Sequence, residues 1–126
     1  MKEIVKTDKA PAAIGPYSQA VRVGGFLFTS GQIPLDPQTG QLVAGPVEAQ
    51  AERVLENLKS LVEASGFTMK DVVKTTVFAA SMEDFAAING VYARYFTQDP
   101  PGRSFVAVKE LPRGALLEIE AVAWKE

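Results

Sequence analysis

Three charged residues near the C-terminus stand in otherwise apolar runs and are the first candidates for chemistry. Arg103 opens the run "RSFVAV", and Glu118 and Glu120 alternate with apolar residues in "LLEIEAVAW". A guanidinium is planar, permanently charged and able to bind a carboxylate through two parallel hydrogen bonds. Two glutamates on one face of a strand could act as a proton carrier and its electrostatic neighbour. If Arg103 lies in a cleft, these residue types predict a site for a small organic acid.

The same residues also have a structural interpretation. An ion pair between Arg103 and Glu118 or Glu120, across a hairpin formed by the two runs, is the more common arrangement for such groups. Glutamate is seldom fully buried unless it is paired, so a solvated strand edge also suits the two acids. Weaker polar candidates, each an ordinary residue of a turn, strand or helix when taken singly, are Tyr17, Ser30, Gly31 and Asn89.

The composition disfavours several kinds of chemistry. The chain has no cysteine and no histidine, which removes thiolate nucleophiles, disulfides, sulfur-ligated metals and the usual general base. With 13 basic and 15 acidic residues the formal net charge is -2, which disfavours nucleic acid as a partner. No window approaches the apolar length of a membrane span, and the N-terminus lacks the apolar core of a signal peptide. We therefore expect a cytoplasmic protein with no membrane partner.

The hydrophobic pattern predicts one domain over residues 1–126, with about six strands and two helices in an α+β arrangement. Apolar residues at helical spacing predict a helix from Pro46 to Ser65, with Gly66 placed to end it. Ser81 is expected to cap a second helix. The predicted strands lie near Ile4, at about Ser18–Val23 and Phe26–Gly31, at Val72–Ala79, and in a terminal hairpin of about Ser104–Lys109 and Leu116–Trp124.

The spacing of residues also predicts which side chains share a face. The central strand is expected to direct Val73, Val77 and Ala79 one way and Phe78 the other. In the last strand, the face that we expect to pack on the helices consists of Leu117, Ile119, Ala121 and Ala123. In the second helix, the stripe that we interpret as core rather than as an aromatic binding site consists of Phe85, Ile88, Tyr92, Tyr95 and Phe96.

Large apolar side chains are expected on the other face of the sheet as well. Two helices can cover only one face of a sheet of this size, so the second face would expose a larger apolar patch than monomers usually tolerate. We therefore expect a homo-oligomer, with the mixed polar and apolar face at a subunit boundary. Such boundaries are common places for ligand sites.

Several segments of the chain resemble the RidA family, also called the YjgF or L-PSP family of reactive-intermediate deaminases. The similar segments are "APAAIGPYSQA", "SGQIPLDPQTG", "VVKTTVF", "GRS" and "LPRGALLEIEAVA", in the family's order and nearly its spacing. The resemblance covers essentially the whole chain. It implies a chorismate-mutase-like α+β fold with two helices on one face of a mixed sheet, assembled as a homotrimer with active sites between subunits.

The resemblance also implies a reaction, which is the hydrolysis of enamines and imines such as 2-aminoacrylate and 2-iminobutyrate to 2-keto acids and ammonium, without metal or cofactor. On this basis Arg103 corresponds to the carboxylate-binding arginine, Glu118 to the acid that handles water and Tyr17 to the site tyrosine. The positions that correspond to supporting residues are Ser30, Gly31 and Asn89.

This sequence departs from the family at one site position. Phe105 stands where many deaminating members carry a cysteine, so a phenyl ring would narrow the pocket or make it more apolar. Two other functions stay open, namely a non-catalytic binder or regulator that uses the same arginine, and the translation-inhibitor or endoribonuclease activity given to some relatives. The acidic charge balance makes the last one less attractive.

Overall fold

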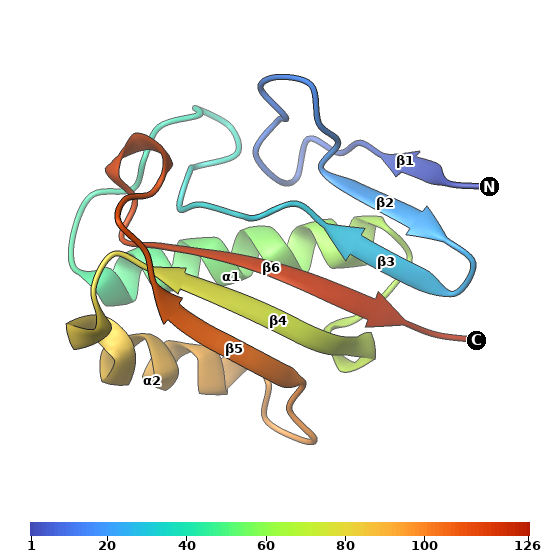
Figure 1. Ribbon diagram of the computed structural model, residues 1–126. Helices are drawn as coiled ribbons and strands as arrows, with labels where there is room; N and C mark the ends of the chain where they lie inside the picture. Colours follow the sequence, from blue (N-terminus) through green and yellow to red (C-terminus); the bar gives the residue numbers. More distant parts are fainter.

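The computed structural model describes all residues 1–126 and has one six-stranded sheet with two helices on one of its faces (Figure 1). The strands are β1 (Glu3–Val5), β2 (Ala20–Val23), β3 (Phe26–Thr29), β4 (Val72–Ala79), β5 (Gly102–Ala107) and β6 (Leu117–Trp124). The helices are α1 (Val47–Ala64) and α2 (Phe85–Tyr95), with short 3-10 turns at Met69–Asp71, Met82–Asp84 and Pro112–Gly114. This confirms the predicted α+β fold.

The order of strands in the sheet is β1-β2-β3-β6-β4-β5. Every neighbouring pair is antiparallel except β4 and β5, which run parallel with Thr75 opposite Arg103. The predicted terminal hairpin is therefore wrong, because β4 lies between β5 and β6 (Figure 1). A strand pattern gives the two faces of a strand but not its neighbours, and the Pro112–Gly114 turn belongs to a crossing connection instead of a hairpin.

The two long elements of the centre follow from their sequences. Helix α1 begins directly after Pro46 and ends before Ser65, and Gly66 has the left-handed φ of +89° that a residue just beyond a helix often adopts. β4 spans the predicted range.

Strands β2 and β3 are shorter than predicted, because residues 18–19 and 30–31 run outside the regular ladder. Ser81 caps the turn before α2 by accepting a hydrogen bond from the Glu83 N–H, rather than capping α2 itself.

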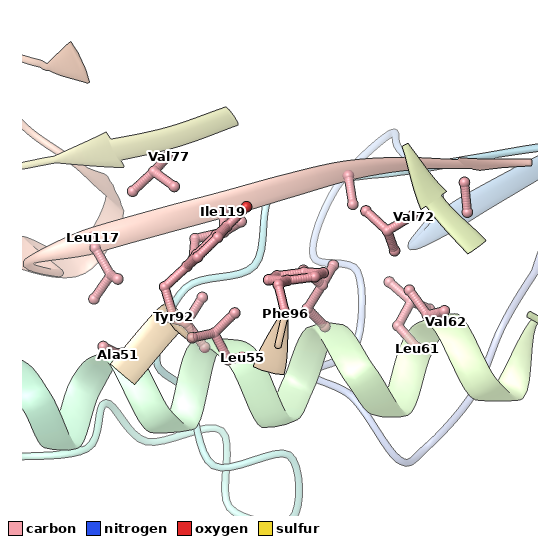
Figure 2. Packing of buried hydrophobic residues seen from close by; sticks show 14 of the residues in the cluster. Ala51, Leu55, Leu61, Val62, Val72, Val77, Tyr92, Phe96, Leu117 and Ile119 are labelled. Atoms are coloured by element: carbon pink, nitrogen blue, oxygen red, sulfur yellow. The ribbon is translucent and has the colours of Figure 1, made fainter. Parts of the chain in front are cut away.

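The core lies between the sheet and the helices. Figure 2 shows Leu117 of β6 above Ala51 of α1 and Val72 of β4 above Leu61 and Val62, and all of these residues belong to one buried cluster. All four predicted inward residues of β6, from Leu117 to Ala123, are buried, as expected. The predicted stripe of α2 is correct in part, since Ile88, Tyr92 and Phe96 are buried whereas Phe85 is exposed and Tyr95 is half-buried.

The start of β4 contains an irregularity that the sequence pattern did not predict. The register with β6 shifts between Val72 and Lys74, which inserts one extra residue into β4. Val72 is consequently buried, and Val73 is exposed instead of facing the helices with Val77. The predicted orientation of Val73 is therefore wrong.

The other face of the sheet is open and carries large apolar side chains. Phe28 and Trp124 are 44% and 43% exposed, and the rings of Phe26 and Phe28 stack with centroids 5.8 Å apart. Val106 of β5 is exposed on the same face. The predicted apolar second face is thus present. No helix of the chain has both the length and the apolar character needed to span a membrane.

Candidate functional site

The Arg103 side chain lies on the helix-covered face, at the edge of the sheet beside α2. Its register partner Thr75 is buried against the helices, so Arg103 points to the same side. One guanidinium nitrogen, Nη1, donates a hydrogen bond of 2.7 Å to Oδ1 of Asn89 on α2. The guanidinium carbon lies 4.9 Å from the ring centre of Tyr92, 5.3 Å from that of Phe105 and 5.8 Å from that of Phe85. A ring of aromatic groups thus surrounds a half-buried cation.

No carboxylate of the chain pairs with Arg103. The ion pair in the structure joins Arg22 and Glu3, at the other edge of the sheet. The prediction of an ion pair between Arg103 and Glu118 or Glu120 is wrong. β4 separates β5, which carries Arg103, from β6, and the two glutamates of β6 lie on the open face of the sheet. Nε and Nη2 of Arg103 make no hydrogen bond within the chain and remain able to bind an external anion.

Glu118 lies on the open face of the sheet, next to Gly31. Backbone hydrogen bonds between Gln32 and Ile119, of 2.8 and 3.1 Å, hold residues 30–32 along β6. A Cβ atom added to Gly31 would lie 2.6 Å from Cδ of Glu118 and would overlap its Oε2, so a glycine is required for this close approach. The Gly31 N–H donates no hydrogen bond within the chain.

The surroundings of Glu118 favour its protonated form. Half-burial raises the pKa of Glu118 above its usual value, and the negative charge of Glu120 on the same face raises it further. A carboxyl group with a raised pKa exchanges protons more readily near neutral pH than an ordinary glutamate. The predicted sharing of a face by the two glutamates is confirmed by their register with Phe78 and Thr76.

Ser30 precedes Gly31 in the chain, and a hydrogen bond links it to the loop that carries Tyr17. The Ser30 hydroxyl donates a hydrogen bond of 2.5 Å to the Ser18 carbonyl, which ties the segment next to Gly31 to the segment next to Tyr17. The Tyr17 side chain is half-exposed, and its hydroxyl oxygen accepts a 3.3 Å hydrogen bond from the Ile14 N–H. Tyr17 also lines a cavity of about 790 Å³ beneath the N-terminal loop.

The predicted site residues thus form two clusters rather than one. The arginine cluster, on the helix side, consists of Arg103, Asn89 and Phe105. The glutamate cluster, on the open side, consists of Glu118, Gly31 and, next to Gly31 in the chain, Ser30. Tyr17 lies in the adjoining loop, where its hydroxyl bonds to the Ile14 N–H, and the structure shows no contact between Tyr17 and Glu118. Because the two clusters face opposite sides of the sheet, one chain cannot bring Arg103 and Glu118 to the same small molecule.

Sequence reasoning missed three residues that support these clusters. Thr75 bonds to the Tyr92 hydroxyl beneath Arg103, and Phe85 meets Phe105 edge to face with centroids 4.8 Å apart. Gln19 is buried and its amide bonds to the backbone of Thr7, Ala10 and Pro11, which holds the loop that carries Tyr17. The spacing of Asn89 and Tyr92, three residues apart, could have shown that these two side chains share one side of the helix, but it gave no signal for the contact of Tyr92 with Thr75.

A second cavity lies apart from both clusters. A cavity of about 730 Å³ lies between the C-terminal parts of α1 and α2, with acidic and basic side chains in its walls, including Glu56, Lys59 and Arg94. No group of three histidine, cysteine, aspartate or glutamate side chains is arranged to hold a metal ion. The side chains of the two clusters supply a guanidinium, an amide, a carboxyl group and a hydroxyl.

Comparisons with known proteins identify the family of the chain. The family model described as Endoribonuclease L-PSP matches residues 7–125. The chain belongs to that family, which is the RidA/YjgF family. It is 50% identical over 126 residues to the 2-iminobutanoate/2-iminopropanoate deaminase of Salmonella typhimurium, with 98% of each chain covered. It is also 52% identical over 126 residues to a RutC family protein of Pyrococcus horikoshii, with all of both chains covered.

Solved structures of this family have the same fold. A Thermotoga maritima protein assigned provisionally as an endoribonuclease has a TM-score of 0.98 at 63% identity, covering 100% of this chain and 99% of that one. Escherichia coli TdcF with bound serine has a TM-score of 0.94 at 47% identity, covering 98% and 99%. The resemblance noted in the sequence is thereby confirmed at the level of family and fold.

Proposed function

We propose that this L-PSP family protein hydrolyses 2-imino acids, such as 2-iminobutanoate and 2-iminopropanoate, to 2-keto acids and ammonium. The observation that carries the proposal is the state of Arg103, whose Nε and Nη2 are free while its Nη1 is held by Asn89. A half-buried guanidinium without a protein carboxylate is suited to a small acid. The 50% identity to the Salmonella typhimurium deaminase supports the same reaction.

The complete site in this proposal lies between two copies of the chain. The arginine cluster of one copy faces the glutamate cluster of the next, which overcomes their location on opposite faces of one sheet. The open apolar face with Phe28 and Trp124 supplies the surface for association. A closed ring of three copies, as implied by the resemblance to RidA, would form a site at each of its boundaries. The whole chain, 1–126, acts as one domain in this assembly.

In the proposed reaction Arg103 binds the substrate carboxylate, with the Gly31 N–H of the neighbouring copy as a second donor. Glu118 accepts a proton from water as the water oxygen forms a bond to the protonated imine carbon. The resulting amino alcohol takes that proton on its nitrogen, the C–N bond breaks, and the hydroxyl proton leaves as the carbonyl forms. Ammonia takes up that last proton, so one imine cation and one water give one keto acid and one ammonium ion.

The other predicted residues have supporting roles in this proposal. The Tyr17 hydroxyl orients the water, the Ser30 hydroxyl holds the loop beside Gly31, and Asn89 holds Arg103. The Phe105 ring lies against Arg103 and Phe85, so it forms an apolar wall next to the bound carboxylate. A protonated imine is already electrophilic, and the step needs no metal or cofactor.

Mixing two inactive variants tests both the residues and their distribution between copies. Arg103→Ala and Glu118→Gln are each expected to lose the acceleration of keto-acid release from imines that an amino-acid oxidase generates. Unfolding and refolding the two variants together in equal amounts should restore about a quarter of the wild-type activity, because each site draws one residue from each of two randomly chosen copies.

Two results would contradict the proposal. If Arg103→Ala released keto acid as fast as the wild type, the arginine would have no part in the reaction. If the co-refolded mixture stayed inactive although mixed assemblies were present by native mass spectrometry, the two clusters would not form one site. Each variant refolded alone is the control for recovery.

A further inference from the structure

We propose that Thr75 and Tyr92 are positioning residues that fix the plane of the Arg103 guanidinium for carboxylate binding. This inference rests on the proposed function, because it assigns a role to residues behind the arginine cluster. Neither residue is expected to touch the substrate, since Thr75 is 0% exposed and Tyr92 is 7% exposed.

Thr75, Tyr92 and Arg103 are each in contact with the other two. Thr75 is the register partner of Arg103 in the parallel pair of β4 and β5, so the two residues start from neighbouring backbone positions. The Thr75 hydroxyl and the Tyr92 hydroxyl share a buried hydrogen bond of 2.6 Å, which fixes the position of the tyrosine ring. The guanidinium carbon of Arg103 lies 4.9 Å from the centre of that ring. The strand that places the arginine backbone thus also places the surface on which its side chain rests.

Helix α2, which carries Tyr92, also fixes the direction of the Arg103 guanidinium. Asn89 and Tyr92 stand three residues apart on α2 and lie on the same side of it. Asn89 accepts from Nη1, while the Tyr92 ring supports the guanidinium at short range. The edge that remains for a carboxylate is the one formed by Nε and Nη2. A bidentate pair depends on this geometry, because both parallel hydrogen bonds must align at once.

Variants can distinguish a positioning role of the Thr75–Tyr92 hydroxyl pair from a role in fold stability alone. Removing one hydroxyl leaves its buried partner without a hydrogen bond, which destabilises the fold whatever the function of the pair. Removing both, in Thr75→Val combined with Tyr92→Phe, leaves two apolar groups of similar shape and is expected to be nearly neutral for stability. The double variant therefore separates fold stability from the placement of Arg103.

The test measures binding of 2-ketobutyrate by calorimetry together with the melting temperature of each variant. The double variant is expected to melt close to the wild type but to bind the acid roughly tenfold more weakly, since misalignment loses part of a charge-assisted bidentate interaction. Thr75→Ser keeps the hydroxyl and should bind like the wild type. In the deaminase assay the KM of the double variant should rise by the same factor, with a smaller change in kcat.

Arg103→Ala distinguishes failure of this inference from failure of the proposed function. If Arg103→Ala binds 2-ketobutyrate as tightly as the wild type, both proposals are overturned. If Arg103→Ala loses binding but the double variant binds like the wild type, the positioning role of Thr75 and Tyr92 is overturned and the proposed function stands. Weaker binding by Thr75→Ser, equal to that of the double variant, would likewise contradict a role for the hydroxyl pair.

Discussion

Replacement of Gly31 by alanine gives a direct test of the contact between Gly31 and Glu118. The backbone of Gly31 does not have a left-handed φ, so alanine introduces no backbone strain there. Its Cβ atom would lie 2.6 Å from Cδ of Glu118, whereas carbon atoms in contact are about 3.5–4.0 Å apart. The carboxyl group must therefore move by about 1 Å, which its flexible side chain allows without unfolding the sheet.

A displacement of this size is expected to reduce activity strongly. A misplacement of about 1 Å in a catalytic group can cost on the order of 100-fold in rate, or roughly 2.7 kcal/mol of transition-state stabilisation. We therefore expect the kcat/KM of Gly31→Ala to fall by about that factor in the keto-acid release assay. The melting temperature should stay close to that of the wild type, because the methyl group is accommodated by one side chain.

Gly90→Ala is the matched control for this substitution. Gly90 lies on α2, and a Cβ atom there would meet nothing within 4 Å. Alanine at an exposed helical position is expected to stabilise the fold by roughly 0.5–1 kcal/mol without lowering activity. If Gly31→Ala folded normally and kept kcat/KM within about twofold of both the wild type and Gly90→Ala, the proposed placement of Glu118 at the reacting carbon would be refuted.

Further predictions concern Glu118 and the open face. Burial raises the pKa of Glu118 in the folded state, so the stability of the fold falls as the pH rises through that pKa and the group ionises. Glu118→Gln should therefore melt at a higher temperature than the wild type at pH 7, and at the same temperature at a pH below the usual glutamate range. A lower melting temperature of Glu118→Gln at pH 7 would contradict this. Glu120→Gln removes a charge that raises the same pKa, so the acidic limb of the kcat/KM profile should move to lower pH, whereas an unmoved limb would exclude Glu118 as the titrating base. Phe28→Glu places a charge on the open apolar face and should convert the proposed oligomer to a monomer in light scattering, with loss of activity; an intact oligomer would show that this face is not the interface.

The sequence alone predicted most helices and strands of the fold and proposed the residue types of the candidate site. Helix α1 and strand β4 follow from apolar spacing at periods near 3.6 and 2, which are local properties of the chain. The same local rule correctly placed Ile119 toward the helices and Glu118 on the other face. The absence of cysteine and histidine also limits the side-chain chemistry to carboxyl, hydroxyl, amide and cationic groups, whatever fold the chain adopts.

The tertiary structure decided which of these residues can act together. Strand order depends on long-range pairing, so no local pattern could show that β4 separates Arg103 from Glu118 or that Val73 turns outward at an irregular register. The contact of Thr75 with Tyr92 joins residues 17 positions apart and forms only when α2 packs on the sheet. Local periodicity determines which face a side chain occupies, but packing between distant segments determines its neighbours, and the chemistry of this site depends on the neighbours.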